Sequence, residues 1–245
     1  MAKQSGLGDN LYVAGFDVSG DIGSLGRIST PRPLLEVTGI DKSAVERIPG
    51  LRDGGMEFSS FFNDATGQAH EAFNDLLTTD QHVMYCRGTT IGNPGAGLVA
   101  KQLNYDLTRG QDGSLVAAIA AEANAFGLDW GRLLTAGKRT DTTATNGAGV
   151  DHTTVTTTFG WTAYLQVFSL TGTSVTVTLQ DSADNVSFAN ITGGAFAAAT
   201  GRTSERLAGA GGSTVRRYIR AITSGTFTNA VFAVLFVRNE ATVVV

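Results

Sequence analysis

Apolar and polar residues alternate through most of residues 152–245, which is the pattern of strands with one buried face. In the segment SVTVTLQ, Val175, Val177 and Leu179 alternate with threonines and a glutamine. The preceding segment WTAYLQVFSL is separated from it by TGT, so we expect two strands joined by a short turn. The segments STVRRYIRAIT and NAVFAVLFVRN, separated by SGTFT, predict two further strands.

The segment from Val231 to Val237 is apolar on both of its faces. Such a pattern is typical of a central strand that is covered on one side by a second sheet and on the other by a neighbouring domain or subunit. Many short strands at regular spacing indicate an antiparallel β-sandwich for this half of the chain.

The first half is also mainly β, with one helix. The strand candidates are LYVAGFDV, LLEVTG, MEFSSFF, HVMYC and VAKQLNYDLT. In SLVAAIAAEANAF the alanines favour a helix, but its place between two Gly-containing segments favours a strand, which we expect. A helix is predicted over GQAHEAFNDLL, with Asp64 or Thr66 as its cap. Its apolar stripe consists of Ala69, Ala72, Phe73, Leu76 and Leu77.

A polar stretch rich in Thr and Gly interrupts the pattern at residues 139–151, and we interpret it as a linker. The predicted domains are therefore residues 1–138 and 152–245. Residues 1–150 hold 12 Lys and Arg against 17 Asp and Glu, whereas residues 151–245 hold 6 against 5. This charge difference indicates two domains with different roles. The long segment 20–39, with little periodicity, is expected to reach a partner.

Composition narrows the class of protein. Charged residues make up 16% of the chain, against about 25% in a typical soluble domain. The net charge of −4 argues against a protein that binds nucleic-acid phosphates. The single Cys86 excludes an internal disulfide framework. A polar N-terminus and the lack of a long apolar run predict a soluble protein made in the cytoplasm, without membrane insertion.

The segment GNPGAGLVAK, residues 92–101, has the spacing of a phosphate-binding loop but not its chemistry. Leu98 and Val99 stand where Lys and Ser or Thr are required, and Lys101 comes too late. Gly95, Gly97 and Ala100 fit a looser dinucleotide pattern, but the residues after them alternate like a strand. The loop GLRDGG, with Arg52 and Asp53 at its centre, precedes a strand rather than a helix. Both segments are therefore predicted to be turns or loops rather than anion sites.

The titratable residues do not form a recognisable catalytic set. His70 and His152 are expected to be solvated. His82 and Cys86 share a strand face but lack a third group to orient them, so a structural thiol is the better interpretation. The chain is not expected to be an enzyme, and no catalytic, cofactor-binding or metal-binding residue is predicted.

Two further clusters have ordinary explanations. Asp181, Asp184 and Asn185 carry oxygen ligands suited to calcium, but they are also the usual residues of a turn between strands, which we prefer. The adjacent arginines at 216 and 217 point to opposite faces of a strand, so with Arg220 they are expected to be solvated or to contact a subunit.

The segment VTGIDKSAVERIPGLRDGGMEFSSFFND, residues 37–64, resembles the signature region of the tail tube proteins of long-tailed bacteriophages. In that family, a turn of the type I-x-G-L-x-D-G leads into an alternating strand and then a helix. This chain supplies Ile48, Gly50, Leu51, Asp53 and Gly54, followed by Met56, Phe58, Ser60 and Phe62. The resemblance covers residues 9–135, and residues 152–245 are similar to the extra β-sandwich that some tail proteins carry outside.

The resemblance implies a mainly β fold, with a tail-tube-like sandwich or barrel and one packed helix, followed by a C-terminal antiparallel β-sandwich. It implies a structural virion protein whose homohexameric rings stack into a tube, assembled in the host cytoplasm. An acidic lumen would let DNA pass without binding, and the other partners would be tape measure, terminator and distal tail proteins. The alternative is a capsid decoration or host-surface adhesion protein, with Trp161, Tyr164 and Tyr218 as candidates for gripping a carbohydrate.

Overall fold

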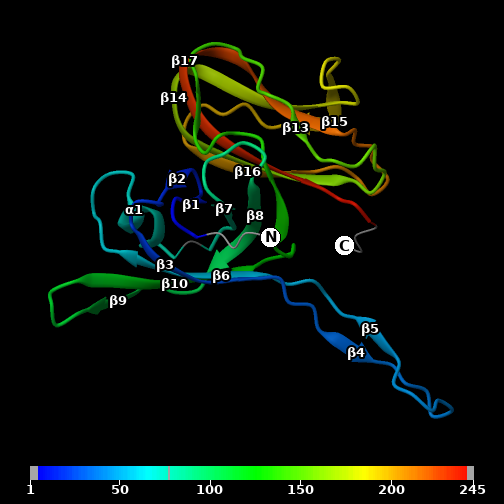
Figure 1. The fold of residues 1–245 in the computed structure, drawn as a ribbon. Helices are drawn as coiled ribbons and strands as arrows, with labels where there is room; N and C mark the ends of the chain where they lie inside the picture. The colour runs from blue at the N-terminus through cyan, green and yellow to red at the C-terminus, as the bar shows by residue number, and fades with distance from the viewer. Residues whose placement is uncertain (1–4, 77, 242–245) are drawn as a thin grey trace.

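The computed structural model describes residues 5–76 and 78–241 (Figure 1). The fold is mainly β, as predicted. The N-terminal part contains the helix α1 (Ala69–Phe73). Its strands are β1 (Asn10–Val13), β2 (Phe16–Asp17), β3 (Ile22–Ser29), β4 (Leu34–Glu36), β5 (Arg47–Pro49), β6 (Gly55–Phe61), β7 (Gln81–Cys86), β8 (Pro94–Gln102), β9 (Asp106–Arg109), β10 (Leu115–Ala123) and β11 (Asp129–Leu133). The C-terminal part contains β12 (Arg139–Asp141), β13 (Val150–Asp151), β14 (Trp161–Ser182), β15 (Ala189–Ala195), β16 (Thr203–Ala208) and β17 (Tyr218–Arg238).

A continuous antiparallel ladder joins the two parts. Its main path runs β15-β14-β17-β11-β8-β10-β6-β3, and β4 and β5 form a separate two-stranded ribbon. Strand β11 connects the parts, because it pairs with β8 on one side and with β17 on the other. The C-terminal part is therefore not joined through a linker alone, because its strands continue the sheet of the N-terminal part.

The C-terminal part is built on two long strands where the sequence predicts four short ones. Strand β14 spans both WTAYLQVFSL and SVTVTLQ, and β17 spans both segments of its predicted pair. The expected TGT turn is wrong, because Gly172 pairs with Phe227 and Ser174 with Thr226 across the ladder. Gly172 takes a φ of +140° where the register shifts, so this glycine supplies a bulge rather than a chain reversal.

Strand β17 is central, as its apolar faces predict. It pairs with β14 along one edge and with β11, β12 and β13 along the other. Phe232, Val234 and Phe236 pack into one cluster of buried side chains. Ala233 and Leu235 pack into a different cluster, which also contains Tyr12 and Met84 of the N-terminal part. The second face is therefore covered by the neighbouring part of the same chain.

Several N-terminal elements differ from the prediction in their limits. The segment LYVAGFDV is not one strand but the hairpin β1–β2, because Ala14 and Gly15 have φ of 50° and 82° and reverse the chain. The segment VAKQLNYDLT divides between β8 and β9. The ambiguous alanine-rich segment forms strand β10, as expected.

Helix α1 is only five residues long and begins after Gln68, whose side chain makes no capping hydrogen bond. The predicted caps Asp64 and Thr66 do not cap it, and Leu76, with φ of 44°, lies beyond its end. Leu77 lies outside the described residues. Ala69 and Phe73 of the predicted stripe are buried, so the helix keeps its inward face while losing its second half. Within the described residues, no helix has the length and apolarity that a bilayer crossing requires.

The predicted linker is partly strand. Residues 139–141 form β12 and residues 150–151 form β13, and both pair with β17. Arg139 holds this segment against β17 by donating to the Ala221 carbonyl at 3.0 Å, and two further hydrogen bonds to the Asp141 carboxylate, of 2.8 and 2.7 Å, orient its guanidinium. A polar, Thr-rich composition is therefore compatible here with strands that are fixed at both ends.

Candidate assembly surfaces and the pocket at the arm base

The glycines of the segment 92–101 serve close packing. Residues 94–102 form strand β8, so no phosphate-binding loop exists there. A side chain at Gly97 would clash with the ring of Tyr164 on β14. A side chain at Gly95 would lie 2.9 Å from Leu235 and 3.0 Å from Leu133. These glycines let the two parts of the molecule approach each other.

The loop GLRDGG is a packed turn, as predicted. The Asp53 carboxylate accepts the amide hydrogen of Gly54 at 2.8 Å. Arg52 reaches Asp129 at 2.7 Å, an ion pair whose acid is buried. A side chain at Gly54 would lie 2.6 Å from the Leu128 side chain, so the loop needs glycine to press against residues 127–129.

The histidines and the cysteine have structural positions. His152, expected to be solvated, is buried, and its Nε2 has no hydrogen-bond partner among the described residues. Burial, and after it the nearby Arg238, lowers the pKa of His152 to about 4. His70 is half-buried and shares a hydrogen bond of 3.0 Å with the Tyr105 hydroxyl.

Cys86 and His82 do not form a catalytic pair. The thiol of Cys86 is buried, and burial raises its pKa well above the ordinary value. The Nδ1 atom of His82 lies 2.9 Å from the Ser204 hydroxyl, so this ring contacts the C-terminal part. Burial lowers the pKa of His82.

The acidic and basic clusters of the C-terminal part are satisfied locally. Asp184 accepts the amide hydrogens of Val186 and Ser187 at 2.9 and 2.8 Å, which is the predicted turn. These backbone bonds hold the pKa of Asp184 far below its usual value. Within residues 5–76 and 78–241, no group of three or more His, Cys, Asp or Glu is arranged to hold a metal.

The three arginines of this region bond to neighbours in the same chain. Arg216 pairs with Asp181, Arg217 pairs with Asp151, and Arg220 donates to Gln180 at 2.9 Å. The aromatic candidates for a sugar groove are also occupied, because Trp161 and Tyr164 are buried. Tyr218 is half-buried, with the Arg217 guanidinium 5.1 Å from its ring centre.

One face of the N-terminal sheet is not covered by any part of the chain that the structure describes. Strands β3, β6, β9 and β10 form a layer with α1, β1 and β7 on one side only (Figure 1). On β6, Met56 and Phe58 point into the core, whereas Glu57 and Phe61 are exposed. We call the exposed side the open face. Its two lateral edges are free among the described strands, because β3 pairs only with β6 and β9 pairs only with β10.

The open face carries a charged cluster. Arg27 of β3 lies 2.9 Å from Glu57 of β6 and also pairs with Glu122 of β10. Asp106 of β9 is exposed on the same layer. Two carboxylates around one guanidinium, together with this aspartate, leave the face with a negative balance.

A second uncovered surface is the arm, which we define as residues 31–53. Its strands β4 and β5 pair with each other only, and the ribbon projects away from the body of the molecule (Figure 1). Its seven large apolar side chains are exposed: Leu34, Leu35, Val37, Ile40, Val45, Ile48 and Leu51. Exposed apolar residues concentrated on one projection mark a contact surface. The sequence predicts one strand here, LLEVTG, and otherwise shows a long segment with little periodicity before Gly39, because a two-stranded ribbon without a core has no buried face to repeat.

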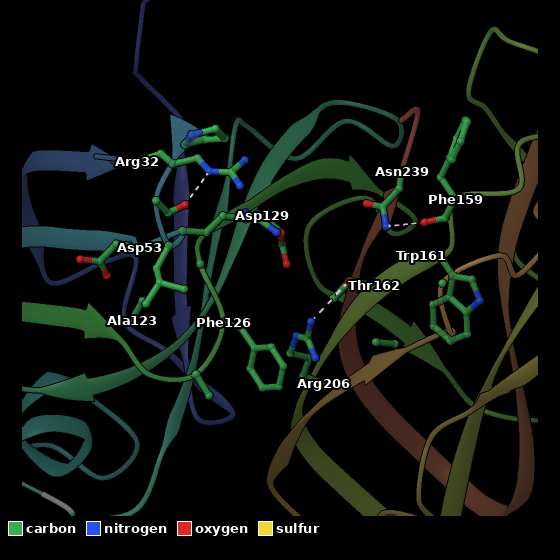
Figure 2. Close-up of a pocket in the computed structure, with 18 of the residues that line it drawn as sticks. Arg32, Asp53, Ala123, Phe126, Asp129, Phe159, Trp161, Thr162, Arg206 and Asn239 are labelled. Atoms are coloured by element: carbon green, nitrogen blue, oxygen red, sulfur yellow. Dashed lines mark hydrogen bonds and ion pairs between the residues drawn. The ribbon is translucent and has the colours of Figure 1, made fainter. Parts of the chain in front are cut away.

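A pocket of about 600 Å³ lies between the base of the arm and the C-terminal part, and we call it the base pocket (Figure 2). The arm contributes Arg32 and residues 49–53, the loop after β10 contributes Phe126, and the C-terminal part contributes Phe159, Trp161 and Arg206. The sequence does not predict this pocket, because six segments that lie apart along the chain meet there.

The base pocket contains two arginines without a carboxylate partner among the described residues. The Arg206 guanidinium stacks on the Phe126 ring at 3.7 Å, and its hydrogen bond to Thr162 is long, at 3.5 Å. The Nε of Arg206 is buried without a hydrogen-bond partner. Arg32 donates to the Gly50 carbonyl at 2.9 Å. The pocket also holds Asp129, which pairs with Arg52, and Asp53, which accepts the amide hydrogen of Gly54, so it combines an aromatic wall with two arginines that have no carboxylate partner among the described residues.

Comparison with known proteins gives distant structural likenesses. No protein-family model matches the sequence, and no curated protein matches it. The Dit protein of phage SPP1, described as a paradigm of the hub adsorption apparatus in phages that infect Gram-positive bacteria, is 11% identical with a TM-score of 0.36, over 94% of this chain and 99% of that one. A chain of the phage p2 baseplate, in its activated conformation with Sr, is 12% identical with a TM-score of 0.33, over 96% and 99%. A P2 baseplate structure with Ca gives 13% and 0.29, again over 96% and 99%. Because these likenesses are distant, the function proposed below rests on the surfaces of this chain.

Proposed function

We propose that the chain is a structural protein of a bacteriophage tail, in which copies join side by side into rings. The observation that carries this proposal is the combination of an open face, two free sheet edges and an exposed apolar arm on one chain. A free edge at each side of a sheet lets identical copies pair edge to edge in a heterologous contact, and such a contact closes into a ring when the rotation allows.

In this proposal residues 1–138 form the wall of a tail tube and residues 152–245 form an outer domain. The β3 edge of one copy meets the β9 edge of the next, which turns the open face toward the lumen of a homohexameric ring. The arm then reaches a neighbouring copy, and stacked rings make the tube. Tape measure, terminator and distal tail proteins are the partners that this position implies.

The charge on the open face supports a path for DNA rather than a binding site for it. Glu57, Glu122 and Asp106 outnumber Arg27 there. A negative wall repels phosphates, so that DNA slides through the lumen instead of adhering to it. The protein performs no catalysis in this role.

A second candidate within the tail is a hub that ends the tube. It is favoured by the continuous ladder through β11, which fixes the C-terminal part rigidly to the N-terminal part. A rigid outer part suits a ring that anchors other components, whereas a tethered one suits decoration of a tube surface. The two candidates differ in whether rings stack without limit.

Negative-stain electron microscopy of the purified protein at several concentrations tests the proposal. Striated tubes of uniform width are expected for a tube subunit, and single or paired rings that do not lengthen are expected for a hub. Dispersed two-lobed particles at every concentration and salt would overturn the ring proposal and favour decoration or adhesion. Leu107→Pro is expected to reduce assembly, because alternate residues of β9 bond to β10 and Leu107 lies on the free side of the strand, with Thr143→Pro in an exposed loop as control.

A further inference from the structure

The arm tip exposes apolar and acidic groups that its own chain does not use. Ile40 is fully exposed, and Val37 and Val45 near it are about half exposed. Lys42 lies 3.6 Å from Glu46, which leaves Asp41 without a cation among the described residues. The tip is therefore an apolar group beside an unpaired carboxylate.

The base pocket offers the complementary chemistry. Its aromatic wall contains Phe126, Phe159 and Trp161, and Arg206 supplies an unpaired guanidinium at that wall. A guanidinium that is already stacked on a ring loses little conformational freedom when it binds a carboxylate, and it often donates two hydrogen bonds in such a pair. An apolar side chain with an adjacent carboxylate is the partner that this pocket fits.

The tip cannot fill the pocket of its own chain. Each side of the arm has about eight residues, which at about 3.3 Å per residue span about 25 Å. The arm projects away from the body, and the pocket lies at its base (Figures 1 and 2). The occupant must therefore come from another molecule, and a second copy of this chain carries the matching tip.

We propose that the base pocket of one copy receives the arm tip of the next, with Ile40 against Phe126 and Asp41 paired to Arg206. The contact is heterologous, so each copy both gives a tip and receives one, and the chain of contacts closes into a ring or continues along a stack. This inference rests on the proposed function and adds to it the place where the arm binds.

A charge exchange tests the pairing. Asp41→Arg and Arg206→Glu are each expected to weaken self-association at least 10-fold in sedimentation velocity, and the double variant is expected to recover to within about 3-fold of the original. Asp64→Arg, a similar charge change at an exposed site elsewhere, serves as control and is expected to leave association unchanged. Thermal unfolding of each variant separates loss of association from loss of the fold.

Cross-linking tests the same contact without altering charge. A chain carrying Ile40→Cys and Ala208→Cys, the second at the pocket, is expected to give a ladder of disulfide-linked multimers under oxidation. Each single-cysteine variant is expected to give no such ladder, because Cys86 is buried.

The outcomes separate the two proposals. Rings that form without a ladder, and without sensitivity to Asp41 and Arg206, would overturn the pocket contact and leave the ring proposal standing. A ladder with charge dependence but no rings would support the contact and overturn the ring. Citrate binding that is lost in Arg206→Glu, with association indifferent to Asp41, would assign the pocket to a small anion and overturn the contact.

Discussion

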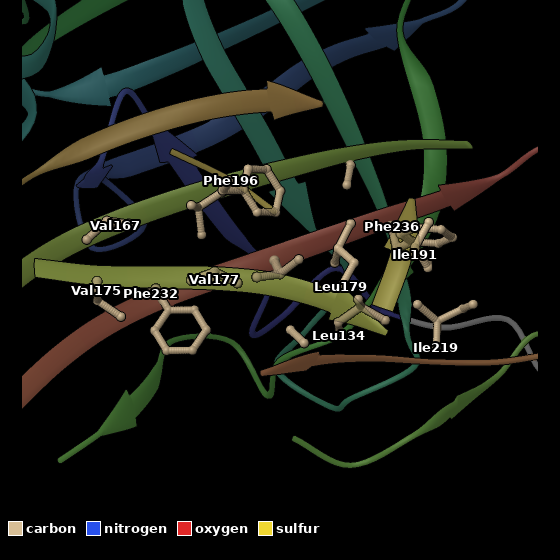
Figure 3. Packing of buried hydrophobic residues seen from close by; sticks show 14 of the residues in the cluster. Leu134, Val167, Val175, Val177, Leu179, Ile191, Phe196, Ile219, Phe232 and Phe236 are labelled. Atoms are coloured by element: carbon tan, nitrogen blue, oxygen red, sulfur yellow. The ribbon is translucent and has the colours of Figure 1, made fainter. Parts of the chain in front are cut away.

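Both parts of this molecule are built from strands with alternating side chains, but they differ in whether both faces of the strand are covered. Around β17, one face packs against the sandwich core of Phe232, Val234 and Phe236 (Figure 3), and the other packs against the N-terminal part. Around β6, one face packs inward and the other carries Glu57 and Phe61 into solvent. Both faces of β17 are therefore covered by its own chain, whereas β6 leaves one face exposed.

The distribution of exposed apolar side chains repeats this difference. Of the 18 large apolar residues that are exposed among the described residues, 15 precede residue 139, and only Val155, Phe159 and Val186 follow residue 151. The C-terminal part therefore buries most of its large apolar side chains within the chain, whereas the N-terminal part leaves many of them exposed.

The largest effect on stability is expected from a cavity in the core of the C-terminal part. Phe232→Ala removes a fully buried ring from β17 and is expected to lower the free energy of unfolding by about 3–5 kcal/mol. Urea unfolding followed by intrinsic fluorescence measures this change. Val186→Ala, at an exposed position of the same part, is the control. A loss of less than about 1 kcal/mol for Phe232→Ala would show that the core is looser than the packing indicates.

The next largest effect is expected where β8 of the N-terminal part packs against β14 of the C-terminal part. Gly97→Ala places a methyl group against the Tyr164 ring, and overpacking of this kind costs about 1–3 kcal/mol. The midpoint of thermal unfolding is expected to fall accordingly. Gly201→Ala has open space around it and no left-handed backbone, so it is expected to stay near the original midpoint. Equal effects of the two substitutions would contradict a tight joint.

The stability of the C-terminal part is expected to depend on pH through His152. In the folded chain the pKa of His152 is about 4, below the ordinary value of 6.5, so the unfolded chain binds a proton first as pH falls. The stability that His152 contributes is complete above pH 6.5 and declines as pH falls toward 4, by about 2 kcal/mol. His152→Phe is expected to remove this part of the decline, measured as the difference between the two chains in urea unfolding at pH 7 and pH 4.5. Parallel curves for the two chains would contradict a buried, neutral imidazole.

The smallest effect on stability is expected on the arm. Ile40→Ser is expected to leave the unfolding midpoint of the monomer unchanged, because its side chain is fully exposed, while self-association falls. Val186→Ser, at an exposed position of the C-terminal part, is the matched control and is expected to change neither quantity. Differential scanning fluorimetry and sedimentation velocity measure the two. A lower melting temperature for Ile40→Ser would show that the arm packs on its own chain.

The sequence predicts those features that depend on local alternation. The buried faces of β6 and β17 follow from which positions are apolar, and the strand character of β10 follows from its place between two Gly-containing segments. The turns expected at Gly172 and near Gly225 do not exist, because the partner strand bonds to the backbone on both sides of each glycine. A glycine pattern is the same for a turn and for a bulge, and only a distant strand decides between them.

Features that depend on contacts between distant segments could not be predicted. Gly97 signals a flexible loop in the sequence, but its role is set by Tyr164, a residue on β14. The burial of His152 depends on β17 and Arg238, and the base pocket depends on segments far apart in the chain. In the arm the sequence predicts the strand LLEVTG but not its pairing with β5, because β5 does not show an alternating pattern.

The central place of β17 has a consequence for the synthesis of the protein. Four strands that are made earlier, β11, β12, β13 and β14, each pair with β17. The pairing of β11 with β17 therefore cannot be completed until about residue 236 has been made, and contacts so distant in sequence form slowly. A truncated chain without β17 would keep its arm but lack a fixed base pocket. Its arm tip could then bind another copy, but its own pocket could not bind an arm tip.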